Sequence, residues 1–124
     1  MKIKESAENY LETILMLSKK NGHVRSIDVA NELKVTKPSV SVAMKNFREE
    51  GYVTFNEDGG IVLTEKGMAI AKKVYERHGI IAKALICIGV DEDVAYEDSC
   101  KIEHDISEHT FEKIKVFLKR YNKI

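Results

Sequence analysis

The chain has 124 residues and a mass of 14.1 kDa; 44% of its residues are hydrophobic, 32% are charged, one is proline and seven are glycine. This composition predicts one folded domain, or a small module with a helical extension, and excludes a disordered chain, a collagen-like repeat and a disulfide scaffold. The 20 basic residues equal the 20 acidic residues in number, which excludes a uniformly basic coat protein for nucleic acid.

The charges are unevenly distributed along the chain. Between Lys19 and Arg48, seven basic residues outnumber two acidic ones, whereas between Asp91 and Glu112 nine acidic residues outnumber one basic residue. The sequence therefore has an early basic region and a late acidic region. It contains no signal peptide and no apolar run of the roughly 18 residues that a membrane helix requires, so we expect a cytoplasmic protein with no membrane partner.

The first half of the chain predicts three helices followed by a β-hairpin. The expected helices cover residues 6–20, 26–34 and 37–50, and the expected strands cover residues 52–55 and 61–63. Ser6 and Ser26 are the expected caps of the first two helices. Thr36 is suited to cap the third helix, Pro38 fits its first turn and Gly51 ends it. The loop between the strands is polar and contains two glycines, which is typical of a hairpin connection.

The second half of the chain predicts helices only. A long helix over residues 65–88 carries an apolar stripe, and Cys87 is expected there as a small core residue. Asp91 is suited to cap a short helix that ends near Ser99, and Ser107 is suited to begin a last helix with apolar residues.

The order helix, helix, tight turn, helix, hairpin predicts a winged helix-turn-helix domain, and the basic region falls on it. If Val40, Met44 and Phe47 face the core, the other face of the third helix can enter the major groove of DNA, where side chains distinguish the base edges. The residues on that face are Thr36, Lys37, Ser39, Ser41, Val42 and Lys45. The alternative is a solvated amphipathic helix in an unrelated helical domain.

Candidate metal ligands occur in the acidic region. Cys100, Glu103 and His104 are spaced i, i+3 and i+4, which would place a thiol, a carboxylate and an imidazole on one face of a helix. Such a donor set favours Fe(II), Co(II), Ni(II) or Zn(II) over calcium or magnesium. Further candidates elsewhere in the chain are Asn9, Glu12 and His78. Taken singly, these residues are also typical of a solvated surface, and Cys100 with His104 as its base could be a reactive cysteine, although no substrate motif accompanies the pair.

Together, these residues form part of a more specific pattern. The chain resembles the metal-responsive repressors of the diphtheria toxin repressor and manganese transport regulator family, and the resemblance spans essentially the whole chain. The matching motifs, in order and spacing, are Ser6–Glu12 (SAENYLE), Tyr75–His78 (YERH), Ile88–Asp91 (IGVD) and Cys100–His104 (CKIEH).

The resemblance implies a mainly α fold in which a winged helix-turn-helix domain, residues 1–64, is followed by a linker helix and a metal-binding dimerisation domain, residues 65–124. It implies a homodimer without enzymatic activity that binds Fe(II) or Mn(II) between the first helix and the dimerisation helices. The metal-loaded dimer would bind operator DNA and repress metal-uptake genes. The implied metal ligands are Asn9, Glu12, His78, Cys100, Glu103 and His104, and the implied DNA contacts lie around Thr36, Pro38, Ser39 and Val42.

The sequence departs from the family pattern at several positions. Asn9 stands where the family usually has an aspartate or a methionine. Cys100 stands where manganese-type members usually have a glutamate, as it does in iron-type members. Ala82 and Tyr96 replace the Glu and His of an ancillary iron-type site, so a complete second site of that type is not expected. The chain also ends without the SH3-like third domain of the longer iron-type members.

Two other classes of function fit parts of the sequence. One is a DNA-binding module controlled by a protein partner or an organic ligand, in which the acidic helices form only an interaction surface. The other is a metal-binding enzyme that contains stacked helices. Metal analysis, combined with DNA binding measured with and without a chelator, separates both from a metal-dependent repressor.

Overall fold

The computed structural model describes residues 5–121, which form helices and one hairpin in the predicted order. The elements are α1 (Glu5–Asn21), α2 (Ser26–Leu33), α3 (Lys37–Glu49), β1 (Val53–Phe55), β2 (Ile61–Leu63), α4 (Glu65–Cys87), α5 (Glu92–Ile102) and α6 (Glu108–Arg120). The chain divides into two compact units, one ending at Lys73 and one beginning at Val74. The predicted mainly α fold with a winged helix-turn-helix is confirmed.

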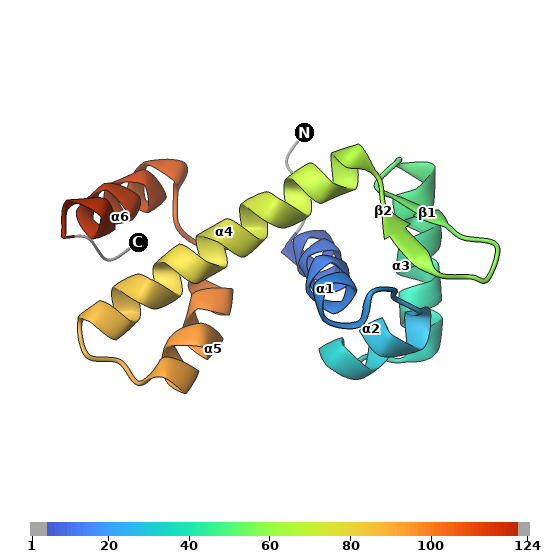
Figure 1. The fold of residues 1–124 in the computed structure, drawn as a ribbon, viewed down its shortest axis with the longest axis horizontal. Coiled ribbons are helices and arrows are strands. Elements are labelled where there is room, and N and C mark those ends of the chain that lie inside the picture. The colour runs from blue at the N-terminus through green and yellow to red at the C-terminus, as the bar shows by residue number, and fades with distance from the viewer. Residues whose placement is uncertain (1–4, 122–124) are drawn as a thin grey trace. The chain divides into compact units, whose positions relative to one another are not determined.

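The first unit contains α1, α2, α3, the start of α4 and the hairpin, which Figure 1 shows beside α3. Thr36 caps α3 as predicted, because its hydroxyl accepts a hydrogen bond from the Ser39 N–H at 3.2 Å. Val40, Met44 and Phe47 are all buried and join the core that α1 and α2 also line. Burial of these three side chains fixes which face of α3 remains outside.

The start of α2 differs from the prediction. Arg25, not Ser26, is the N-cap residue, and the Asp28 carboxylate accepts its backbone N–H at 3.0 Å. The Arg25 guanidinium also donates to the Asp58 carbonyl oxygen in the hairpin loop at 2.8 Å. Arg25 therefore connects the start of α2 to the tip of the wing. Ser6 is likewise not a cap, because it lies inside α1.

The hairpin is a short antiparallel pair in which Val53 lies opposite Leu63. It is attached to the helices at Ile61, whose N–H donates to the Val24 carbonyl oxygen at 2.7 Å. Val53 and Ile61 bury one face of the pair against the core of the unit. The hairpin thus has a fixed position beside α3, as a DNA-binding wing requires.

The second unit consists of the remainder of α4 with α5 and α6. Its core contains Ile80, Ile81, Phe111 and Leu118. Ser107 caps α6 as predicted, accepting the Thr110 N–H at 3.1 Å. No helix within residues 5–121 is long and apolar enough to cross a membrane.

Two predictions for the second unit are wrong. The helix predicted to end near Ser99 continues to Ile102, since no glycine or proline stops it. Cys87, predicted as a core residue, is exposed at the end of α4. The neighbouring Ile88 is 76% exposed, although it was expected to be the last residue of the apolar stripe of the long helix.

Candidate metal centre and nucleic-acid interface

The residues predicted to contact DNA lie on the outer face of α3 and, in the case of Thr36, at its N-cap. Val42, the apolar residue among them, is 63% exposed. The other members are exposed too: Thr36, Lys37, Pro38, Ser39, Ser41 and Lys45. Thr36 and Ser39 are linked by a hydrogen bond of 2.8 Å between their hydroxyl oxygens, so the start of the helix presents them as a fixed pair.

One further cation of α3, Arg48, belongs to the predicted basic region but was not among the predicted DNA contacts. Arg48 lines a surface hollow of about 260 Å³ together with Lys45 and Ser41 of α3 and Phe55 of β1. Its guanidinium lies 5.4 Å from the centre of the Phe55 ring, so it stands between α3 and the hairpin. The i, i+3 spacing of Lys45 and Arg48 is the signal that could have identified it.

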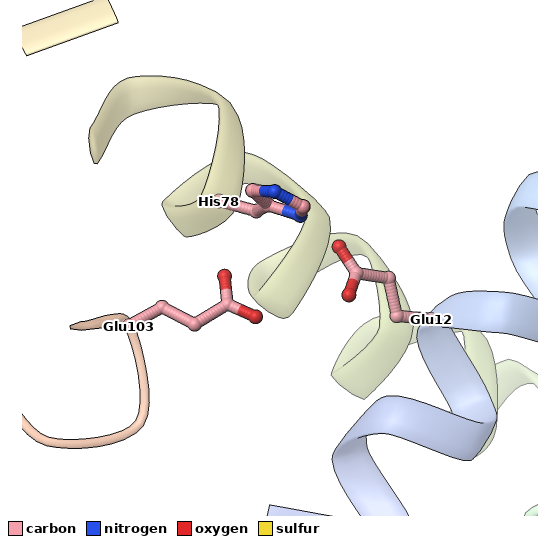
Figure 2. Close-up of side chains that lie close together, drawn as sticks. All are labelled: Glu12, His78 and Glu103. Carbon is pink, nitrogen blue, oxygen red and sulfur yellow. The ribbon is translucent and has the colours of Figure 1, made fainter. Parts of the chain in front are cut away.

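His78 and Glu103 come together within the second unit. His78 lies on α4 and Glu103 directly follows α5, and their ligand atoms are within 4.8 Å of one another (Figure 2). The Glu103 side chain is only 1% exposed. Charged carboxylates are buried at a high free-energy cost unless cations or donors compensate them, so this pair is a candidate centre for a cation.

The His78 ring is oriented by α5. Its Nε2 lies 2.9 Å from the Tyr96 carbonyl oxygen, which can only accept a hydrogen bond. Nε2 therefore carries a proton, and in the neutral form of the ring Nδ1 would hold the lone pair that can bind a metal ion. A carbonyl partner on one ring nitrogen is the usual way in which a metal-binding histidine is held in its tautomer.

Glu103 and His104 lie in a turn rather than on a helix. Because α5 ends at Ile102, the prediction of one helical face for Cys100, Glu103 and His104 is wrong for His104. The His104 Nε2 and the Glu103 Oε1 are nevertheless 3.4 Å apart, and the His104 side chain is only 3% exposed. Cys100 is a half-buried thiol on α5. Among the described residues, neither Cys100 nor His104 has a ligand atom within 4.8 Å of the ligand atoms of both His78 and Glu103.

The other predicted ligands lie on α1 in the first unit. Asn9 is half-buried and Glu12, one turn further along, is only 4% exposed. A carboxylate buried to this extent is unusual for a glutamate on an amphipathic helix.

The donor types of the described residues fit a divalent transition metal. A neutral imidazole nitrogen and carboxylate oxygens are ligands of Mn(II), Fe(II) and Zn(II), and a thiolate would add affinity for the later metals of this row. The burial of Glu103 and the orientation of His78 are the features that such an ion requires.

Comparison with known proteins gives family matches in both units. The model of the N-terminal DNA-binding domain of iron-dependent repressors matches residues 2–61. The model of the metal-binding and dimerisation domain of the same repressors matches residues 64–123.

Several relatives are similar over most of this chain. An uncharacterized HTH-type transcriptional regulator of Methanocaldococcus jannaschii, MJ0568, is 34% identical over 119 residues, which are 94% of this chain and 95% of that protein. The HTH-type transcriptional regulator MntR of Bacillus subtilis (strain 168) is 36% identical over 109 residues, which are 88% of this chain and 77% of MntR. These relatives are transcriptional regulators, not enzymes.

Solved structures of larger proteins share the fold. The manganese regulator SloR is 28% identical, with a TM-score of 0.78 over 96% of this chain and 55% of SloR. T. acidophilum IdeR is 24% identical, with a TM-score of 0.81 over 98% of this chain and 55% of IdeR. The present chain therefore spans about half the length of these two proteins.

Proposed function

This chain belongs to the iron-dependent repressor family of metal-dependent, DNA-binding transcriptional regulators, and on that premise we propose that it represses metal-homeostasis genes as a metal-loaded cytoplasmic homodimer. Residues 1–64 would bind the operator, and residues 65–124 would bind metal and dimerise. The observation that carries the proposal is the pair formed by half-buried His78 and buried Glu103, which lies in the part of the chain that matches the metal-binding domain.

We propose Fe(II) or Mn(II) as the physiological metal, with Co(II), Ni(II) or Zn(II) as further ions that the site can accept. The proposed ligands are Asn9, Glu12, His78, Cys100, Glu103 and His104. The mixture of amide, carboxylate, imidazole and thiol donors supports a first-row transition metal rather than calcium.

The proposed ligands come from both units of the chain. Asn9 and Glu12 belong to α1, whereas the remaining ligands belong to α4, α5 and the turn after α5. When bound, the cation would supply positive charge that offsets the negative charges of its two carboxylate ligands, Glu12 and Glu103. Without the ion, the like charges of the proposed carboxylate ligands would repel one another. The residues on α1 would thereby make the position of the DNA-binding unit depend on metal.

Operator binding would use the outer face of α3. The proposed contacts are Thr36, Lys37, Pro38, Ser39, Ser41, Val42 and Lys45. Lys37 and Lys45 would pair with phosphates, which orients the protein on the duplex without reading its sequence. Ser39 and Val42 would face base edges, where the valine methyl groups suit the thymine methyl group.

The proposal is tested by metal analysis of the purified protein and by DNA binding with and without a chelator. The probe is a duplex selected from a random pool by the protein in the presence of Mn(II). We expect specific binding with Mn(II), loss of binding with the chelator, and loss of the metal response in Glu103→Gln. Glu112→Gln, which removes an exposed carboxylate of α6, is the matched control and should behave like the unmodified protein. Chelator-insensitive binding would instead favour control by a protein partner or an organic ligand.

A further inference from the structure

Arg77 precedes His78 on α4 and contacts the backbone of the turn that carries Glu103. Its Nη2 donates to the carbonyl oxygen of Glu103 at 2.9 Å and to that of Ile106 at 3.2 Å. The Arg77 side chain is only 16% exposed, so water competes weakly for these bonds. A single guanidinium thus spans the connection between α5 and α6.

Two contacts to α6 hold the same guanidinium in place. Its Nη1 lies 3.3 Å from the Glu108 Oε2, and its central carbon lies 5.1 Å from the centre of the Phe111 ring. The planar fork of arginine can make the bonds to the carbonyls and to the carboxylate at once, while its face packs on the ring. A lysine could reproduce the charge but only part of this geometry.

The turn closes α5 through the Ile102 carbonyl oxygen, which accepts the N–H groups of Asp105 at 2.9 Å and Ile106 at 3.2 Å, whereas the Glu103 carbonyl oxygen is bonded by Arg77. The last carbonyl groups of a helix have no partners within the helix, and glycine or proline, which commonly close a helix end, is absent from residues 103–107. A cation at this end is also favoured by the helix dipole. Arg77 supplies the donor and the charge from α4, and its bonds fix the backbone of Glu103 on the side of α4 that carries His78.

We infer that Arg77 is a positioning residue for the metal centre, because its hydrogen bonds set Glu103 beside His78 before any metal ion binds. The inference rests on the proposed function, since it takes Glu103 and His78 as ligands. A site formed in advance has less conformational entropy to lose on binding, so its affinity for metal is higher. Residues that orient metal ligands typically contribute about 10- to 100-fold to metal affinity.

The test compares Co(II) affinity and backbone hydrogen exchange in four full-length proteins. Arg77→Met removes the donors and the charge but keeps the apolar stem on Phe111, and Arg77→Lys restores the charge. Lys115→Gln is the matched control, because Lys115 also joins α6 to α4, through Glu76 at 2.8 Å, without contacting the turn. Exchange is measured on residues 103–107 of the metal-free proteins, a readout that is independent of metal loading.

We expect Arg77→Met to bind Co(II) about 10- to 100-fold more weakly and to lose exchange protection in residues 103–107. Arg77→Lys should recover part of both, and Lys115→Gln should remain within about twofold of the unmodified protein, because exposed ion pairs contribute little. Unchanged affinity and protection in Arg77→Met would overturn the inference while the proposed function stands. If the unmodified protein fails to bind Co(II), the proposed function is wrong. The exchange measurement still tests the inference in that case, because unchanged exchange in Arg77→Met would show that the Arg77 hydrogen bonds do not order residues 103–107. If Arg77→Met does not fold, Arg77→Lys is compared with the unmodified protein instead. Unchanged Co(II) affinity and unchanged exchange in Arg77→Lys would then overturn the inference.

Discussion

Val42 is the residue on which DNA sequence recognition can be tested most directly. Its side chain is 63% exposed on α3, so a polar replacement costs the fold little. We expect Val42→Asp to reduce specific DNA binding at least about tenfold, because it loses an apolar base contact and brings a negative charge to the duplex. Fluorescence anisotropy on the selected duplex measures the effect, and a thermal melt verifies the fold. Val42→Thr keeps one methyl group and the shape and is the control; operator affinity unchanged in Val42→Asp would show that α3 does not read the DNA.

Cys100 decides whether the metal centre contains sulfur. It lies on α5, one turn before Glu103, but its sulfur is not within 4.8 Å of the ligand atoms of both His78 and Glu103. We expect the Co(II)-loaded protein to show an intense near-ultraviolet charge-transfer band from a thiolate ligand, and Cys100→Ser to remove it. Cys87→Ser replaces the other thiol, which is exposed, and should leave the band intact. Absence of the band from the unmodified protein would mean that the centre uses nitrogen and oxygen donors only.

Two glycines of α4 should respond in opposite ways to the same substitution. A Cβ at Gly67 would overlap the backbone carbonyl of Tyr52, whereas a Cβ at Gly79 would meet no atom of the described residues within 4 Å. We expect Gly67→Ala to destabilise the protein by about 1–3 kcal/mol, because backbone must move. Gly79→Ala should leave stability unchanged or raise it by up to about 1 kcal/mol, because alanine favours the helix. Urea unfolding of both variants measures the difference; equal stabilities would mean that α4 does not pack on Tyr52 as described.

Local signals predicted the elements better than they predicted their ends and their burial. Thr36 and Ser107 were identified as caps because a cap depends on residues within one turn. Arg25 was not identified, because its role depends on Asp28 and on Asp58 in the distant hairpin loop. Of the candidate metal centre, the sequence suggested the ligand types, but the meeting of His78 with Glu103 depends on how α4 packs against α5 and its turn. The contacts of Arg77 could not be predicted from the sequence either, because they also depend on how α4 packs against the turn after α5.

The whole molecule is expected to act as a twofold dimer through its second unit. In the described chain, Ile88 and Phe117 are 76% and 48% exposed and line an apolar groove of about 400 Å³ with Leu85 and Ile114. We expect Ile88→Lys and Phe117→Lys to shift the protein from dimer to monomer in sedimentation at micromolar concentration, since a charge in an apolar interface is costly. Operator affinity should fall in the variants that no longer dimerise, because a dimer binds two half-sites and a monomer binds only one. Ile27→Lys, an exposed isoleucine of α2, should remain dimeric; a monomeric unmodified protein with full DNA affinity would contradict the prediction.

Coupling between metal and DNA is a property of the two units together, and Glu12 is where it can be broken. Glu12 belongs to the DNA-binding unit, whereas His78 and Glu103 belong to the other unit, so a proposed ligand on α1 would make the DNA-binding unit respond directly to metal. By linkage, Mn(II) must raise DNA affinity by the same factor by which DNA raises Mn(II) affinity, and typical couplings are about 1–3 kcal/mol. We expect Glu12→Gln to retain weaker Mn(II) binding at the ligands of the second unit while its DNA affinity becomes insensitive to Mn(II). Titrations of each ligand with and without the other, in the unmodified protein, in Glu12→Gln and in Glu32→Gln as an exposed-carboxylate control, measure all four affinities of the cycle. Full coupling in Glu12→Gln would show that α1 takes no part in the metal response, and a factor that differs between the two directions would show that Mn(II) acts at more than one site.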